Sequence, residues 1–240
     1  MNRKLLVLFF LSLIIGIAGC GNPVRHRVER SIAQSLPEII GQAQSYSVKA
    51  DGSISGMMNG KLRSLDIIGL GVQLKSGVTV SCLNVKITDI SFDPDTKKIR
   101  SVGATEYSAS LTDAELTRYL ICKYPDIPSL SVNMNGSLIN ISAKPGVSVL
   151  RVPINANAGL IIKNEHILAL DLKKLKVAGI NAPGFAVDYL ESKLDVIFDA
   201  NDLGFDAKIK TVIIGPNTLT LDGNLDLIKA IEQQITVPTQ

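Results

Sequence analysis

The residues with the clearest chemistry lie near the N-terminus, where Ile17, Ala18, Gly19 and Cys20 follow one another. An aliphatic residue, two small residues and a cysteine resemble a lipobox, in which the cysteine thiol takes a diacylglyceryl group and becomes the mature N-terminus. Small side chains let a signal peptidase approach the backbone, and only a thiol can form the thioether. We therefore expect Cys20 to be a lipid anchor. The alternative is a short N-terminal anchor that contains a cysteine by chance.

The residues before this pattern have the composition of an export signal. Arg3 and Lys4 are followed by residues 5–18, which are apolar except for Ser12 and Gly16. This apolar run is shorter than the roughly 20 residues that a bilayer-spanning helix needs. We expect a signal peptide at 1–19, a lipidated tether at 20–23 and a single domain at 24–240. The mature protein would be exported and membrane-anchored in the cell envelope, in the periplasm or on the outer surface.

Charge and composition exclude some partners of the mature chain. The signal holds two of the 25 basic residues and none of the 22 acidic ones, so the remainder has a net charge of +1. This is not the charge of a nucleic-acid binder. Hydrophobic residues make up 46% of the chain, yet only 5% are aromatic and none is tryptophan. The sequence therefore favours aliphatic surfaces, with the membrane as partner, and gives no indication of protein partners.

The sequence lacks the motifs of common catalytic and metal sites. Its two histidines, His26 and His166, are not at metal-ligand spacing with Cys, Asp or Glu, and no nucleophile elbow or phosphate-binding loop occurs. We expect no enzyme activity, no cofactor and no metal. Cys82 and Cys122 could form a disulfide after export, or could be two buried free thiols. We favour the free thiols.

The spacing of apolar residues predicts an α+β fold with a long antiparallel sheet. Helical spacing over 24–40 gives way to a period of two over 46–111. In that run, simple alternation places Leu62, Ser64, Asp66, Ile68, Leu70, Val72 and Leu74 on one side, with Leu65 and Ile67 opposite. A capping box, Thr112 with Glu115, predicts a helix over 111–120. Strands are expected within 130–177, a helix after Pro183, a hairpin over 208–225 and a short helix over 225–235.

In this order of elements the chain resembles the LmeA-like phospholipid-binding family over roughly residues 24–228. The segments that carry the resemblance are VERSIAQSLPEIIGQA, VKADGSISGMMNGKLRSLDIIGLGVQL, LNVKITDISFD, IRSVGATEYSASLTDAELTRYL and IKTVIIGPNTLTLDGNLDL. The resemblance implies a strongly curved sheet wrapped around helices, similar to half of a tubular lipid-binding protein. It also implies phospholipid binding in an apolar groove, in support of envelope maintenance, and no catalytic residues.

An aliphatic sheet with amphipathic helices suits acyl chains, which bind by burial of apolar surface. The residues expected to line a groove for phospholipid or a similar acyl lipid are Leu70, Val72, Leu83, Val85, Ile87, Leu116 and Leu120. The basic cluster Lys173, Lys174 and Lys176 could contact headgroups, or could be an ordinary solvated face. The alternative function is a structural or interaction lipoprotein with a self-packed β-rich core and no ligand.

Overall fold

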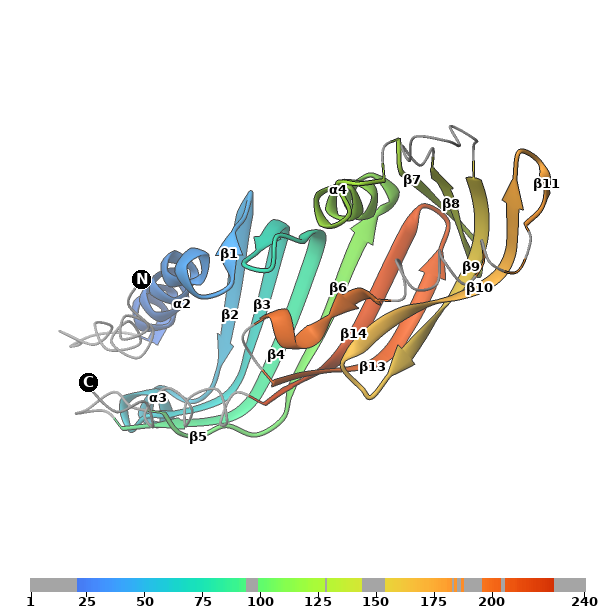
Figure 1. Cartoon of the computed structure of the whole chain (residues 1–240). Helices are drawn as coiled ribbons and strands as arrows, with labels where there is room; N and C mark the ends of the chain where they lie inside the picture. The colour runs from blue at the N-terminus through green and yellow to red at the C-terminus, as the bar shows by residue number, and fades with distance from the viewer. Residues whose placement is uncertain are drawn as a thin grey trace, which may run out of the picture.

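Two antiparallel sheets and a few helices form the described part of the chain in this computed structural model (Figure 1). The structure describes residues 21–93, 99–127, 129–143, 154–182, 196–203 and 206–226, together with Gly184 and Val187. The predicted lipid anchor Cys20 and the predicted helix beyond residue 226 lie outside these residues. The α+β class and the predominance of antiparallel strands are as the sequence predicts.

The first sheet contains the long strands that dominate the fold. Its order is β1-β3-β4-β6-β14-β13, with β2 paired to β3 and β5 paired to β4. The strands are β1 (Gly41–Gln42), β2 (Ser45–Asp51), β3 (Lys61–Leu74), β4 (Thr79–Phe92), β5 (Ile99–Ser101), β6 (Thr105–Thr112), β13 (Asp206–Gly215) and β14 (Thr218–Asp226). Strand β6 pairs with β14, so the predicted C-terminal hairpin extends the N-terminal half of the sheet.

The second sheet has the order β11-β10-β9-β8-β7, with β12 paired to β10. Its strands are β7 (Ser131–Asn135), β8 (Leu138–Ala143), β9 (Ile154–Lys163), β10 (Ile167–Val177), β11 (Ile180–Asn181) and β12 (Val196–Asp199). The backbone N–H of Ile209 in β13 donates to Glu165 O at 2.6 Å, which links the two sheets. Buried apolar residues of both sheets form one cluster.

The described helices pack at the ends of these strands: α2 (Gly21–Ile39), α3 (Ile54–Met58), α4 (Asp113–Lys123) and the 3₁₀ helix η2 (Ala200–Leu203). Helix α2 begins three residues before the predicted boundary at residue 24 and takes in much of the expected tether. Ile32 and Leu36 are buried on its inner side, as the helical spacing predicts. Of the helix expected after Pro183, the structure describes Gly184 and Val187 as helical, and Val187 packs against the core.

The predicted capping box fixes the start of α4. The Thr112 hydroxyl accepts from the Glu115 backbone N–H at 3.4 Å, and the Glu115 carboxylate accepts from the Thr112 N–H at 2.7 Å. Helix α4 also covers the free edge of β7, because Asp113 Oδ1 accepts from the Met134 N–H and Thr117 Oγ1 accepts from the Val132 N–H, each at 3.0 Å. These side chains satisfy backbone donors that an open sheet edge would leave unpaired.

The β3–β4 pair bends without losing its single apolar face. Asp89 and Gly71 lie within these strands with left-handed backbone angles, φ 49° and φ 57°. At Gly71 the buried side of β3 shifts by one residue, from Ile67 to Val72. At Asp89 the buried side of β4 shifts from Ile87 to Ile90, and the facing part of β3 shifts with it, from Leu62 to Leu65. A left-handed residue in a strand turns the chain as a β-bulge does, which restores the apolar residues to the same side. The lower ends of β2, β3 and β4 curve towards α3 in Figure 1.

This bend contradicts the simple alternation expected for residues 62–74. Leu62 and Val72 lie on the buried side with Leu65 and Ile67, whereas Ile68 and Leu70 are each 45% exposed on the other side. In β3 the alternation of burial holds from Leu65 to Gly69, because the buried side shifts by one residue at Gly71 and again opposite Asp89 of β4.

Two further expectations differ from the structure. The period of two expected to run on to residue 111 is interrupted, because β5 ends at Ser101 and β6 begins at Thr105. Cys82 and Cys122 are free, as favoured, yet neither is buried: Cys82 is half-buried and Cys122 is exposed. Cys82 lies opposite Leu70 on the same outer side of the sheet, where alternation with buried Leu83 places it.

Tyrosine rings cover two glycines of the first sheet. Tyr46 lies opposite Gly69, and Tyr107 lies opposite Gly223. A Cβ atom at Gly223 would lie 2.8 Å from the Tyr107 ring and 1.9 Å from Lys208 O. The absence of a side chain at residue 223 is therefore what allows the ring and the neighbouring strand to come so close.

We predict that Gly223→Ala lowers the free energy of unfolding by about 2 kcal/mol, because the new methyl group must displace backbone as well as the Tyr107 ring. Gly159→Ala is the matched control, since a Cβ atom there would meet nothing closer than 3.9 Å. The control should change stability by less than about 1 kcal/mol. Urea unfolding of both variants tests this, and equal midpoints for the two would contradict it.

Candidate functional site

The candidate site is the buried side of the first sheet, here called the inner face. Across β3, β4, β6 and β14 the strand register aligns its residues in rows. One row is Gly69, Leu83, Ala109 and Leu221; the next is Ile67, Val85, Tyr107 and Gly223; a third is Leu65, Ile87 and Thr105. Apart from one tyrosine, one threonine and two glycines, these rows are aliphatic.

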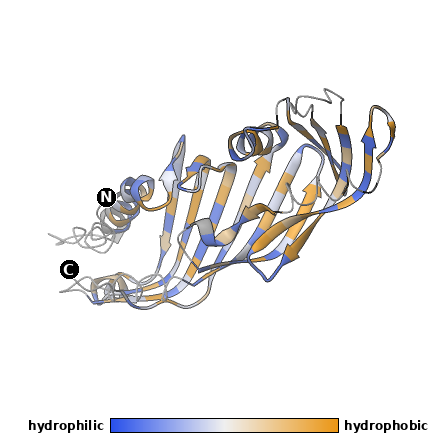
Figure 2. Cartoon of the chain, viewed as in Figure 1, coloured by the Kyte–Doolittle hydropathy of each residue, from blue (hydrophilic) through white to orange (hydrophobic). Residues whose placement is uncertain are grey.

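The opposite side of the same strands, the outer face, is mostly polar. Its rows are Leu70, Cys82, Ser110 and Thr220; Ile68, Asn84, Ser108 and Asp222; and Asp66, Lys86, Glu106 and Asn224. The third row alternates acidic and basic side chains across neighbouring strands, an arrangement that stabilises a sheet. Hydrophobic and hydrophilic residues alternate along these strands in Figure 2, so the sheet has one apolar and one solvated face.

Six of the seven predicted lining residues belong to the buried cluster. Leu83, Val85 and Ile87 occupy three successive inner-face rows on β4 and are 7–9% exposed. Val72 lies farther along β3, where it pairs with Val80. Leu116 and Leu120 point into the cluster from one side of α4, which packs against β4, β6 and β7.

Leu70 is the predicted lining residue that the structure separates from the others. It pairs with Cys82 on the outer face and is 45% exposed, one residue before the left-handed Gly71. Leu70 is not part of the inner-face rows, so we do not retain it as a lining residue.

The three predicted headgroup lysines lie on β10 of the second sheet. Lys173 occupies a bulge between Leu172 and Lys174, and its ammonium group is 2.5 Å from Asp171 Oδ2. Lys174 and Lys176 are exposed, whereas Leu175 between them is buried. They pair with Asn157 and Asn155 of β9. The structure therefore places these cations on a solvated face, on a different sheet from the inner-face rows.

The inner face offers apolar contact rather than acid–base or nucleophilic chemistry. Among the described residues, the buried polar side chains are Ser35 and Thr105. Both histidines have structural partners, since His26 Nδ1 lies 3.2 Å from a Glu29 carboxylate oxygen and His166 Nδ1 lies 2.7 Å from Ala207 O. No group of three potential metal ligands occurs in the part of the chain that the structure describes.

Tyr107 supplies the one phenol in these rows. Its hydroxyl donates to Lys208 O at 3.3 Å, and burial, together with the nearby Asp222 carboxylate, raises the pKa of Tyr107 to about 12. The phenol therefore stays neutral at physiological pH, and no formal charge enters the centre of the inner face.

Of the eleven residues in the inner-face rows, sequence reasoning identified three, Leu83, Val85 and Ile87. Tyr107 and Ala109 on β6 alternate with polar residues, a signal that identifies a buried side but not which strand lies beside it. Leu221 and Gly223 on β14 join the rows through a pairing between segments about 110 residues apart. No local pattern identifies that pairing.

None of the helices among the described residues has the length and apolar composition of a membrane span.

Comparison with known proteins gives one match. The family model described as LmeA-like phospholipid-binding matches residues 19–224, which is most of the chain. No curated protein and no solved structure matches the chain.

Proposed function

Because the chain belongs to the LmeA-like phospholipid-binding family, we propose that it is a lipid-anchored envelope protein that holds the acyl chains of a phospholipid, or of a similar lipid, against the inner face. The observation that carries this proposal is the two-faced first sheet, in which aliphatic rows face one way and polar rows the other. Its role would be lipid carriage or envelope maintenance, without catalysis.

The chemistry of the inner face fits an acyl chain. Leu83, Val85 and Ile87 present branched aliphatic side chains at three successive rows of the inner face. Each methylene that passes from water to such a surface contributes about 0.8 kcal/mol. On an uncharged surface of this kind, affinity depends on the length of the acyl chain and not on the headgroup.

A headgroup needs polar partners beyond the inner face. We retain Lys174 and Lys176 as proposed contacts for an anionic headgroup, since both are exposed and adjacent along one side of β10. Lys173 is a weaker candidate, because Asp171 already pairs with its ammonium group.

The alternative is a structural or interaction lipoprotein in which the same aliphatic residues pack only against each other. Val85 at 7% and Leu116 at 2% exposure are compatible with that arrangement too. The two functions differ in what a polar side chain does at these positions: it weakens ligand binding in a lipid site, but it mainly destabilises a self-packed core.

We predict that Val85→Asn and Leu116→Asn weaken the binding of a fluorescent phospholipid by at least about tenfold, a loss of roughly 1.4 kcal/mol, while the protein stays folded. Leu70→Asn is the matched control, because Leu70 has the same side chain as Leu116 but is half exposed on the outer face. It should leave both binding and the unfolding midpoint unchanged.

Circular dichroism and urea unfolding accompany each binding measurement. Wild-type protein that binds no phospholipid, together with Val85→Asn and Leu116→Asn variants that simply unfold, would contradict lipid binding and leave the self-packed lipoprotein.

We further predict that Cys20→Ser prevents lipidation and cleavage, because a hydroxyl cannot form the thioether. The variant should accumulate as an uncleaved precursor held by residues 1–19, whereas the wild-type chain should carry enough acyl chains for stable anchoring. Intact-mass measurement of the membrane fraction distinguishes the two forms. A mature wild-type protein without lipid would refute the anchor.

A further inference from the structure

Helix α3 presents two large apolar side chains to solvent at one end of the molecule. Ile54 and Met58 are four residues apart, so they share one side of the helix, and they are 47% and 54% exposed. Met57 is buried and packs α3 against the core. The Ser53 hydroxyl accepts from the Gly56 N–H at 3.0 Å and fixes the start of this short helix. The capped start of α3 and the buried Met57 therefore hold the two exposed side chains in place.

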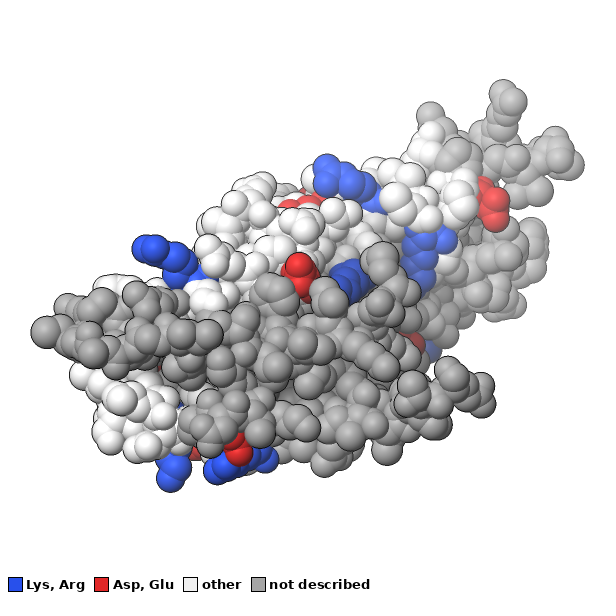
Figure 3. Space-filling view, turned by 90° about the vertical axis from the view of Figure 1, so that its left-hand side faces the viewer, with Lys and Arg blue, Asp and Glu red and all other residues white. Residues whose placement is uncertain are grey.

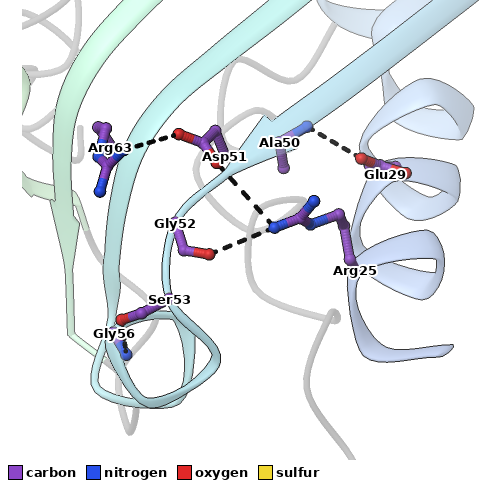
Figure 4. Close-up of polar contacts among 8 residues, drawn as sticks. All are labelled: Arg25, Glu29, Ala50, Asp51, Gly52, Ser53, Gly56 and Arg63. Atoms are coloured by element: carbon purple, nitrogen blue, oxygen red, sulfur yellow. Dashed lines mark hydrogen bonds and ion pairs between the residues drawn. The ribbon is translucent and has the colours of Figure 1, made fainter. Parts of the chain in front are cut away.

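The first turns of α2 contact the chain just before α3, at the end of β2 (Figure 4). Arg25 donates to Gly52 O at 3.4 Å, and its guanidinium lies 4.0 Å from the Asp51 carboxylate. One turn later, the Glu29 carboxylate accepts from the Ala50 N–H at 3.1 Å. Helix α2 is thus bound to the end of β2, immediately before the residues that lead into α3.

This attachment sets where the proposed lipid anchor meets the fold. Helix α2 begins at Gly21, to which Cys20 is bonded, and an α-helix rises about 1.5 Å per residue, so Gly21 and Arg25 are about 6 Å apart along the axis. A diacylglyceryl group on Cys20 would hold this end of the molecule at the bilayer surface. Ile54 follows Gly52 by two residues and so lies at the same end.

Basic side chains surround α3. Arg63 lies 3.5 Å from the Asp51 carboxylate that Arg25 also approaches, so two guanidinium groups share one carboxylate. Lys61, which directly follows Gly60, is exposed, and the nearby Asp93 is paired with Arg100. The four basic side chains named in this paragraph outnumber its two aspartates, so the region has a net positive charge. Figure 3, which looks onto this end, shows basic side chains, with a few acidic ones among them, on the described part of the surface.

We propose that Ile54 and Met58 insert into the interface of the bilayer that carries the Cys20 lipid, with Lys61 and Arg63 against anionic headgroups. The inference rests on the proposed anchoring at Cys20. Apolar side chains that penetrate the interface, flanked by cations, are the two elements of interfacial binding. The anchor holds the chain at the membrane, and α3 sets its orientation there.

The lack of tryptophan in the chain allows a direct test. Met58→Trp, Ile180→Trp and Ile213→Trp each introduce one fluorophore at an exposed apolar position: on α3, at the tip of the β10–β11 hairpin, and on β13. The full lipidated protein is reconstituted into vesicles of phosphatidylglycerol and phosphatidylcholine, with and without brominated acyl chains. Circular dichroism checks that each variant is folded.

Emission from Met58→Trp should move to shorter wavelength and be quenched by brominated chains several-fold more than emission from the other two variants. The difference should shrink in pure phosphatidylcholine and at high salt, because screening weakens attraction to the headgroups.

Protein that fails to remain with the vesicles would refute the proposed anchoring, and this inference with it. Anchored protein in which Met58→Trp is quenched no more than Ile213→Trp would refute the docking of α3 alone. Stronger quenching of Ile180→Trp would likewise refute it, and would assign membrane contact to the β10–β11 hairpin instead.

Discussion

The separation of an apolar from a polar face along the bent β3–β4 pair is the constraint on which the rest of the structure depends. Asp89 and Gly71 take left-handed backbone angles within the strands, and each shifts the alternation of side chains by one residue. Without these shifts, Ile90 and Val72 would lie on the solvated side and polar neighbours would enter the core, at a cost of several kcal/mol. Because the shifts keep the aliphatic residues together, β6 and β14 can continue the same rows.

The helices complete this arrangement at the strand ends. Helix α4 covers the edge of β7 with Asp113 and Thr117 and contributes Leu116 and Leu120 to the buried cluster. Helix α2 covers the edge of β2 through Glu29 and brings the residue next to Cys20 close to α3. The proposed anchor and the proposed lipid-binding face thus belong to one continuous structure, and the family match over residues 19–224 includes both.

The features that could be predicted from the sequence are those set by residues close together in the chain. The capping box at Thr112, the stripe of Ile32 and Leu36, and the C-terminal hairpin each depend on residues close together in the chain. The separation of Leu70 from Val72 could not be predicted, because the one-residue shift at Gly71 places these two residues on opposite sides of the sheet. The pairing of β6 with β14 joins distant segments, and the bulge at Lys173 depends on the register of β10 with β9. These are consequences of tertiary structure.

The central claim is that acyl chains lie on the inner face. Photo-crosslinking with a phospholipid that carries a diazirine in its acyl chain, followed by peptide mass spectrometry, tests this claim most directly. We expect adducts on inner-face residues such as Leu83, Val85 and Ile87, and on Leu116 or Leu120 of α4. Adducts confined to the outer-face residues Ile68 and Leu70, or no adducts at all, would contradict the account.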